Sequence, residues 1–401
     1  MPIYQSTSFV FEDAADAADL FALQKYGNIY TRISNPTTAA FEERMASLEG
    51  GIGAVATASG QAAEFLTATA LAGSGDNLVS ASSLYGGTHT MFSTTLGRLG
   101  VEARFVDGDD PEAFAARVDD RTRFLYTEII GNPSGSVADL EALGEVAAAH
   151  QLPLVVDSTF ATPYLCRPFE HGADIVVHSA TKFIGGHGTS IGGVVVESGR
   201  FDWGSGRFDQ MTEPAAGYNN LRFWENFGEY AFCTKLRAEQ LRDVGASLSP
   251  FNAFLLLQGL ETLPQRMDEH VANAQAVAEF LDAHPLVSWV AYAGLASSPY
   301  HDLARRYMPR GPGAVFTFGV EGGRAAGAAF IEGLTMISHL ANVGDARTLV
   351  IHPGSTTHQQ LSDDDLAAGG VTPDMVRLSV GLEDLDDICW DLDQALAGTT
   401  A

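Results

Sequence analysis

The sequence predicts an α/β protein with a mostly parallel seven-stranded sheet covered by helices, followed by a smaller α+β domain. Two observations support this fold class. Between about residues 52 and 197, short apolar runs typical of buried strands alternate with Ala-rich runs typical of helices. After about residue 235 this alternation ends, and a long apolar stretch at 249–267 leads into helices and more widely separated strands.

The first region contains seven expected strands, with helices between many of them. The strands are expected at residues 54–58, 77–81, 101–107, 122–128, 152–157, 173–179 and 192–197. The clearest helices are expected at residues 59–72, 86–100 and 140–151. Right-handed crossover connections place the carboxyl ends of parallel strands along one edge, which is where ligands bind in such sheets.

These patterns divide the chain into three regions. Residues 1–40 are expected to form an irregular arm, and residues 41–245 the domain that contains the large sheet. Residues 246–401 are expected to form the α+β domain, with strands at 313–320 and 375–382 among others.

Composition and charge limit the function classes. The formal net charge of −27 argues against nucleic-acid or anionic-membrane partners, because its field repels phosphate. Cys166, Cys233 and Cys389 lie far apart without a CxxC pair, so neither a disulfide framework nor a zinc site is predicted. The start of the sequence lacks the pattern of a signal peptide, and no apolar run approaches membrane-spanning length. We therefore expect a soluble cytoplasmic protein.

Lys182 is one of only three lysines, whereas the other twenty basic residues are arginines. It lies between an apolar strand and a glycine run, and Asp157 ends the preceding strand, so an amine and a carboxylate converge at one sheet edge. The flanking Ser179 and Thr181 can bind a phosphate together with backbone N–H groups. A lysine amine can form a Schiff base, which a guanidinium cannot. A salt bridge or a solvated loop lysine is the alternative interpretation.

Pyridoxal phosphate (PLP) is a cofactor that joins these features, because it needs a lysine, an acid beside its ring nitrogen, a phosphate site and an aromatic neighbour. Gly60 and Gln61, after Ser59, stand at an expected helix N-terminus, which favours a phosphate. Tyr85 and Asn132 follow two other strands and could contact the ring. Taken singly, these residues also fit an N-cap serine, a half-buried tyrosine and a turn before proline.

One long segment carries a resemblance to a known family. DSTFATPYLCRPFEHGADIVVHSATKFIGGHGTSIGG (157–193) resembles the signature of the Cys/Met-metabolism PLP-dependent enzymes of fold type I. YTRISNPT, SGQAA, LYGGT, GNP and VRLSVGLED are further matches, so the resemblance covers nearly the whole chain. Within this family, HLANVGDARTLVIHPGSTTHQQLS (339–362) is most similar to the O-acetylhomoserine sulfhydrylases, also called O-acetylhomoserine aminocarboxypropyltransferases.

The resemblance implies a role for each candidate residue. Lys182 would bind PLP covalently and move protons, and Asp157 would keep the ring nitrogen protonated. Tyr85 would stack on the ring and assist proton movement, and Asn132 would contact the ring hydroxyl. The residues implied to bind the phosphate are Gly60, Gln61, Ser179 and Thr181.

The resemblance also implies contacts from outside this sheet. Arg377 would bind the substrate α-carboxylate, with Asn342 nearby. Tyr30 and Arg32 would reach the phosphate of the neighbouring subunit, as part of a homotetramer built from two dimers with shared active sites. The sequence departs from the family pattern at Ile129 and Ser158, and it begins at MPIYQ, within an arm that members usually extend upstream.

The expected activity is γ-replacement on O-acetyl-L-homoserine by sulfide or methanethiol, giving L-homocysteine or methionine and acetate, in methionine biosynthesis. Cystathionine γ-synthase, methionine γ-lyase and O-succinylhomoserine sulfhydrylase are the alternatives on the same scaffold. A nucleotide or sugar-phosphate binding module is disfavoured because the chain lacks GxGxxG and Gly-Lys-Ser/Thr loops. A metal hydrolase is disfavoured because His352 and His358 have no carboxylate-bearing metal motif beside them, and no metal is expected.

Overall fold

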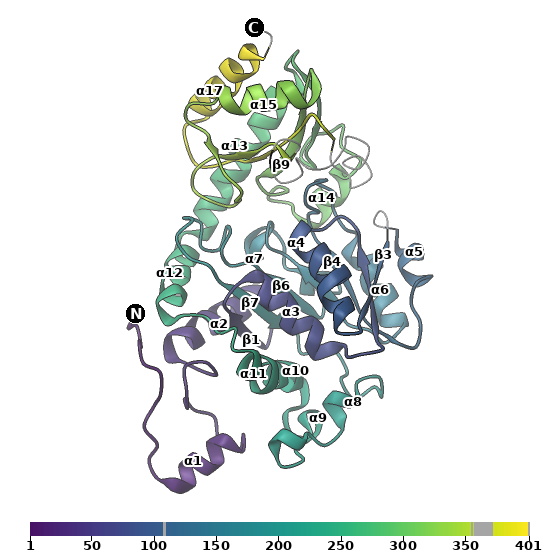
Figure 1. Ribbon diagram of the computed structural model, residues 1–401, viewed down its shortest axis with the longest axis vertical. Helices are drawn as coiled ribbons and strands as arrows, with labels where there is room; N and C mark the ends of the chain where they lie inside the picture. Colours follow the sequence, from purple (N-terminus) through teal and green to yellow (C-terminus); the bar gives the residue numbers. More distant parts are fainter. Residues whose placement is uncertain (107–109, 354–355, 357–371, 400–401) are drawn as a thin grey trace.

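The central sheet of the computed structural model contains seven strands in the order β1-β7-β6-β5-β4-β2-β3 (Figure 1). The structure describes residues 1–106, 110–353, 356 and 372–399. The strands are β1 (Gly53–Thr57), β2 (Asn77–Ala81), β3 (Glu102–Val106), β4 (Thr122–Glu128), β5 (Leu154–Asp157), β6 (Ile175–His178) and β7 (Gly193–Glu197). All seven predicted strands are therefore present, within two residues at each end.

Strand direction agrees with the predicted mostly parallel sheet. Strands β3, β2, β4, β5 and β6 pair in parallel, whereas β7 runs antiparallel to both β6 and β1. Because β7 reverses direction, the connection at residues 179–192 begins and ends at the same sheet edge. Thr181 closes this connection: its hydroxyl donates to the Gly192 carbonyl and accepts from the Gly192 N–H, both at 3.1 Å.

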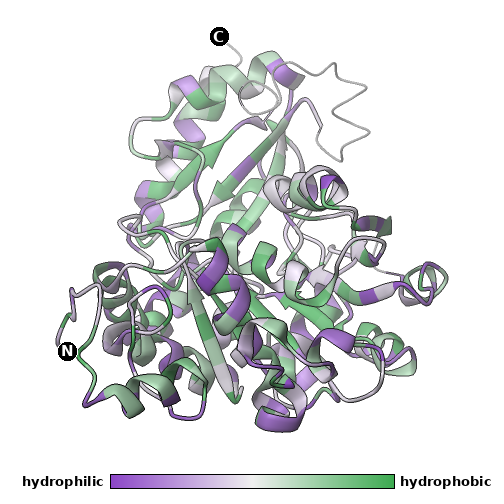
Figure 2. Cartoon of the chain, turned by 60° about the horizontal axis from the view of Figure 1, so that its bottom comes forward, coloured by the Kyte–Doolittle hydropathy of each residue, from purple (hydrophilic) through white to green (hydrophobic). Residues whose placement is uncertain are grey.

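Helices cover the central sheet, and hydrophobic residues concentrate in the strands between them (Figure 2). Helix α3 packs against β6 and β7, and its first turn reaches the sheet edge. The helices of this region are α2 (Pro36–Glu49), α3 (Gly60–Leu71), α4 (Gly86–Thr90), α5 (Pro111–Ala115), α6 (Leu140–Ala149), α7 (Thr162–Leu165), α8 (Asp209–Thr212), α9 (Phe223–Phe227), α10 (Ala231–Lys235) and α11 (Arg242–Val244). The helix predicted at 86–100 is divided, because α4 continues as a π-helical segment at Met91–Leu96.

A second sheet occupies the other end of the molecule (Figure 1). Its strand order is β10-β11-β12-β9-β8. The strands are β8 (Val287–Ala291), β9 (Val315–Val320), β10 (Ser338–His339), β11 (Leu349–Ile351) and β12 (Met375–Ser379), and the helices are α12 (Pro250–Glu261), α13 (Leu263–Asp282), α14 (His301–Tyr307), α15 (Gly323–Gly333) and α17 (Leu385–Gly398). The smaller α+β unit expected from the sequence is present, with α12 and α13 connecting the two sheets.

The N-terminal arm is more regular than predicted. Helix α1 (Ala14–Phe21) begins where the Asp13 side chain accepts the Asp16 N–H at 2.8 Å. Helix α2 begins at Pro36, after the Asn35 side chain caps it. The prediction of forty irregular residues is wrong because these local caps start helices within that range. No helix in the described residues is both long and apolar enough to cross a membrane.

Candidate active site

The loop after β6 places Lys182 beside residues from the second sheet. The Lys182 Nζ donates a hydrogen bond to Oδ1 of Asn342 at 2.5 Å. The pKa of this amine is lowered to about 8, first because burial removes water from the charged form, and then because the Arg377 guanidinium repels it. The partner of the amine in the described part of the chain is thus an amide oxygen, not the carboxylate of Asp157. The salt-bridge interpretation of Lys182 does not fit this geometry.

Arg377 and Asn342 come to the same place from two segments of the second sheet. Arg377, on β12, donates to Oδ1 of Asn132 at 3.3 Å, and burial lowers the pKa of its guanidinium. Asn342 follows β10 and contacts Lys182. The backbone here is tight, because a Cβ at Gly344 would lie 2.6 Å from the Phe183 nitrogen. The second sheet therefore provides a cation and an amide to the edge of the first.

The first turn of α3 meets the end of β6 without an intervening side chain. A Cβ at Gly60 would lie 2.6 Å from the Cβ of Ser179, so only glycine permits this approach. Ser59 caps the helix by accepting the Ala62 N–H at 3.1 Å. The Ser179 N–H donates to the Thr159 hydroxyl at 2.8 Å. Free N–H groups and the helix dipole at this end favour a bound anion.

Two predicted phosphate ligands already have partners inside the chain. The hydroxyl of Thr181 is engaged with Gly192, as described above. The Gln61 side-chain amide donates to Glu64 at 3.1 Å and to the Thr88 hydroxyl at 3.3 Å. The Gln61 side chain is therefore directed into the protein, and its backbone N–H remains at the start of α3.

Tyr85 and Asn132 lie on loops joined by a buried glutamate. Glu128, the last residue of β4, accepts the Tyr85 N–H at 2.6 Å, and it also accepts the Asn132 N–H. The Tyr85 side chain is 51% exposed, so its ring is open to a ligand. Asn132 in turn accepts from Arg377. These contacts connect the two loops with the second sheet.

Asp157 lies at the end of β5, in register with Val177 of β6. Its Oδ1 accepts the Thr159 N–H at 2.7 Å. Burial raises the pKa of Asp157, although the hydrogen bonds from Thr159 and the nearby His178 oppose that shift. The carboxylate is therefore an acceptor held at the same sheet edge as Lys182.

The sequence analysis missed Glu64 and Glu128. Glu64 is buried on α3, and its Oε2 accepts the Thr88 hydroxyl at 2.8 Å. One signal was available for Glu64, because it is an acidic residue within an Ala-rich helix that was expected to cover the sheet. Glu128 had a similar signal, since it ends a buried strand just as Asp157 does.

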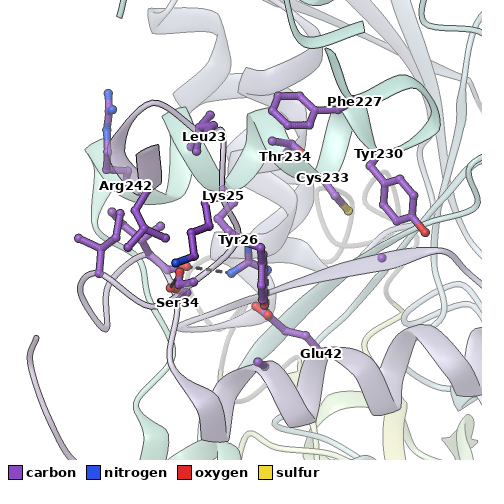
Figure 3. A pocket seen from close by; sticks show the side chains of 18 of the residues that line it. Leu23, Lys25, Tyr26, Ser34, Glu42, Phe227, Tyr230, Cys233, Thr234 and Arg242 are labelled. Atoms are coloured by element: carbon purple, nitrogen blue, oxygen red, sulfur yellow. Dashed lines mark hydrogen bonds and ion pairs between the residues drawn. The ribbon is translucent and has the colours of Figure 1, made fainter. Parts of the chain in front are cut away.

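The chain does not bring Tyr30 and Arg32 into this group of contacts. The Arg32 guanidinium lies over the Tyr30 ring, 4.9 Å from its centroid, so the two arm residues contact each other. A cavity of about 760 Å³ separates part of the arm from α9 and α10 (Figure 3). Tyr26 on the arm side, and Phe227 and Tyr230 opposite, are among its mainly apolar lining residues.

The predicted histidines occupy a different environment. His352 lies within hydrogen-bonding distance of the Pro373 carbonyl, at 2.8 Å from its Nε2. His358 lies outside the described residues. The described histidine contact is thus with a backbone carbonyl, as in an ordinary loop.

The arrangement fits a PLP group. The amine of Lys182 is desolvated and has a lowered pKa, and Asp157 presents a carboxylate at the same edge. The glycine contact between Gly60 and Ser179 keeps the helix N-terminus open to a phosphate. Tyr85 presents an exposed aromatic ring.

Known proteins are similar to this chain over nearly its whole length. The family model for Cys/Met metabolism PLP-dependent enzymes matches residues 1–397. O-acetyl-L-homoserine sulfhydrylase of Leptospira meyeri is 51% identical over 405 residues, covering 99% of this chain and 92% of the relative. Homocysteine synthase of Schizosaccharomyces pombe is 52% identical over 399 residues, covering 99% and 93%.

One solved structure is similar to this chain over nearly the whole length of both proteins. The crystal structure of a candidate O-acetylhomoserine (thiol)-lyase from Campylobacter jejuni matches with a TM-score of 0.96 and 39% identity, covering 99% of this chain and 95% of that one. That crystal structure contains N'-pyridoxyl-lysine-5'-monophosphate, in which the cofactor is joined to a lysine.

Proposed function

Because the chain belongs to the Cys/Met metabolism PLP-dependent enzyme family, we propose that it is an O-acetylhomoserine sulfhydrylase. The reaction replaces the acetate at Cγ of O-acetyl-L-homoserine with sulfide or methanethiol, and gives L-homocysteine or methionine in methionine biosynthesis. The observation that carries this proposal is the identity of 51–52% over nearly the whole chain to proteins named O-acetyl-L-homoserine sulfhydrylase and homocysteine synthase.

PLP, when bound, supplies an aldehyde that joins to amines and a protonated ring that withdraws electrons from the substrate α-carbon. Lys182 would hold the cofactor covalently, and its free amine would remove the proton from Cα of the substrate. A pKa of about 8 supports this role, because a base near neutral pKa is free to accept a proton at working pH. Asn342 orients the amine through its Oδ1.

Asp157 holds a proton at the ring nitrogen, because an adjacent carboxylate stabilises the positively charged ring. Tyr85 would stack on the ring and assist proton movement, and Asn132 would contact the ring hydroxyl. The phosphate is bound by backbone and side-chain groups of Gly60, Gln61, Ser179 and Thr181. The open helix N-terminus at Gly60 supports this placement.

Arg377 binds the α-carboxylate of the substrate. Its guanidinium is half-buried, and burial lowers its pKa, so an incoming carboxylate finds a cation that is poorly solvated. A guanidinium binds a carboxylate through two parallel hydrogen bonds, which fixes orientation as well as position. The substrate α-carbon would then face Lys182, whose amine feels the charge of Arg377.

We propose that the arm of one subunit contributes residues to the active site of its neighbour. We place Tyr30 and Arg32 of one subunit against the phosphate of its neighbour, in a tetramer of two dimers. A groove of about 730 Å³ beside the start of α3, lined by Gln61, Gly86 and Gly87 among others, is a suitable receiving surface.

Three further expectations belong to this proposal. Residues 41–245 form the PLP-binding catalytic domain, and residues 246–401 form the α+β domain that contributes Arg377. The three cysteines are free thiols, which supports a reducing cytoplasmic location.

A substrate panel tests the proposed reaction. The full-length protein loaded with PLP is assayed for homocysteine formation from O-acetylhomoserine and sulfide. O-succinylhomoserine with sulfide, O-succinylhomoserine with cysteine, and methionine alone are the competing assays. We expect the acetyl ester with sulfide or methanethiol to give the highest kcat/KM. Ammonia release from methionine without sulfide incorporation would reassign the protein to the γ-lyases.

A further inference from the structure

Three carboxyl groups lie close together at the edge of the central sheet that holds the proposed PLP ligands. They belong to Glu64 on α3, Glu128 on β4 and Asp157 on β5. Glu64 and Glu128 are buried, and Asp157 is half-buried. The carboxyls of Glu64 and Asp157 lie close enough for each to shift the pKa of the other: Asp157 raises the pKa of Glu64, and Glu64 lowers that of Asp157.

Burial raises the pKa of Glu128 and of Asp157, but hydrogen bonds from backbone N–H groups oppose that shift at both carboxyls. Glu128 accepts the backbone N–H groups of Tyr85 and Asn132. Asp157 accepts the Thr159 N–H at 2.7 Å and faces His178. Backbone N–H donors and a neighbouring basic group favour the ionised form of a carboxyl.

Glu64 has no comparable support. In the described part of the chain its hydrogen bonds come from the neutral side chains of Thr88, at 2.8 Å, and Gln61, at 3.1 Å, and both reach Oε2. No backbone N–H and no basic side chain contacts its carboxyl among the described residues. Burial, followed by the negative charge of Asp157, raises the pKa of Glu64 well above its usual range.

Among the other titratable groups around Glu64, Tyr126 lowers the pKa of Glu64, but less than burial and Asp157 raise it. The hydroxyl of Tyr126, on β4, is buried close to Glu64, and burial beside the three carboxyls raises its pKa. His178, on β6, lies close to the Glu49 carboxylate, with its Nε2 2.5 Å from Oε1. Two adjacent buried carboxylates repel each other, so Glu64 and Asp157 are expected to hold one proton between them.

We propose that Glu64 is a positioning residue that remains a neutral carboxylic acid and donates a hydrogen bond to Asp157. This bond fixes the orientation of the Asp157 carboxyl and keeps it ionised, with its other contacts available to the PLP ring nitrogen. Glu64 does not touch the cofactor; it acts through Asp157. The inference rests on the proposed placement of PLP.

Two substitutions at Glu64 distinguish a need for its hydrogen-bond donor from a need for its negative charge. Glu64→Gln keeps an N–H donor for Asp157 and a carbonyl acceptor for Thr88, so it reproduces the neutral acid. Glu64→Leu has a similar size but removes the donor. We expect the dissociation constant of PLP to stay within about threefold of the parent protein in E64Q, and to rise at least about tenfold in E64L, as expected for the loss of a hydrogen bond to a charged group.

Glu197→Gln is the matched control. Glu197 is a buried glutamate that accepts the Trp203 Nε1–H and the Cys233 N–H, each at 2.8 Å, away from the proposed PLP ligands. Spectrophotometric titration of the full-length protein, stripped of cofactor and reloaded with PLP, gives the dissociation constants. Circular dichroism confirms that each variant is folded. We expect E197Q to bind PLP within about threefold of the parent protein.

The outcomes are distinct. If E64Q weakens PLP binding as much as E64L, the charge of Glu64 is required and the neutral acid is excluded. If both variants bind PLP like the parent protein, Glu64 has no positioning role. A parent protein that fails to bind PLP would contradict the proposed function instead.

Infrared spectroscopy tests the proton directly, also where E64L does not fold. A neutral Glu64 gives a carbonyl stretching band of a carboxylic acid in the PLP-loaded protein, which E64Q removes. If this band is missing from the difference spectrum between the parent protein and E64Q, then Glu64 is ionised and the proposal is wrong.

Discussion

The edge of the central sheet and the N-terminal arm each hold predicted PLP ligands, but their surroundings differ. At the sheet edge, Lys182 is hydrogen-bonded to Asn342 of the second sheet's region, and Thr181 is hydrogen-bonded to Gly192 across its own connection. On the arm, Arg32 packs on Tyr30 within the same segment. One chain thus brings the proposed covalent and acid–base residues to one sheet edge by itself, whereas we expect the arm to be positioned by a second chain.

Lys182→Arg tests the sheet edge and has the largest expected effect. Arginine keeps the positive charge but cannot bind PLP covalently, so turnover should fall on the order of a thousandfold or more. Turnover and the PLP that borohydride reduction fixes to the protein are measured, with circular dichroism as the folding control. Near-normal turnover would show that Lys182 only carries charge.

Arg32→Ala tests the arm. Removing its hydrogen bonds to a phosphate should lower PLP affinity by about tenfold to a hundredfold, as for other charge-assisted hydrogen bonds. If the site is shared, coassembling inactive Lys182→Ala chains with Arg32→Ala chains restores activity. One of the two sites in each mixed dimer is then intact, so a random mixture reaches about one quarter of the parent activity. Unchanged activity after mixing would argue that each chain uses its own arm.

Gly60→Ala tests the close contact between the start of α3 and Ser179 at the sheet edge. The added Cβ would lie 2.6 Å from the Ser179 Cβ, so the start of α3 must move, at a cost of about 1–3 kcal/mol in the free energy of unfolding. Gly97→Ala is the matched control, because its backbone is helical (φ −56°) and no atom lies within 4 Å of its Cβ position. The control should be stabilised by up to about 1 kcal/mol. Equal denaturation midpoints for both variants would contradict the close contact.

The pH dependence of Lys182 gives the smallest expected effect. Its lowered pKa means that the neutral amine predominates above about pH 8 and is lost by protonation below it. The rate of covalent PLP attachment should therefore rise with pH through a midpoint near 8. Arg377→Gln removes a repelling cation, so the midpoint should move upward by a fraction of a pH unit. A midpoint that does not move, or moves downward, would exclude this electrostatic link.

Much of the fold and the central residues of the site could be predicted from the sequence. Continuous apolar runs predict the strands, and parallel topology then predicts that Asp157 and Lys182 lie at one edge of the sheet. The scarcity of lysine in an arginine-rich chain distinguished Lys182 from an ordinary surface cation. These inferences depend on local patterns and on simple rules of sheet topology.

Contacts between distant segments could not be predicted in the same way. The hydrogen bond from Lys182 to Asn342 joins residues 160 positions apart, and no local pattern indicates it. The carboxyl cluster of Glu64 and Asp157 likewise depends on how α3 packs against the sheet. Helix α1 was missed because its cap, Asp13, is one of several similar acidic residues in that stretch.

The distribution of lysines has a practical consequence for labelling. If Lys182 binds PLP as proposed, Lys25 and Lys235 are the other side-chain amines. Each pairs with a carboxylate, Lys25 with Asp16 and Lys235 with Glu239, but the Lys25 side chain is 49% exposed and that of Lys235 only 7%. Amine-reactive dyes would therefore attach preferentially to the arm, at Lys25. Energy transfer between differently labelled chains would then report when one subunit's arm approaches another.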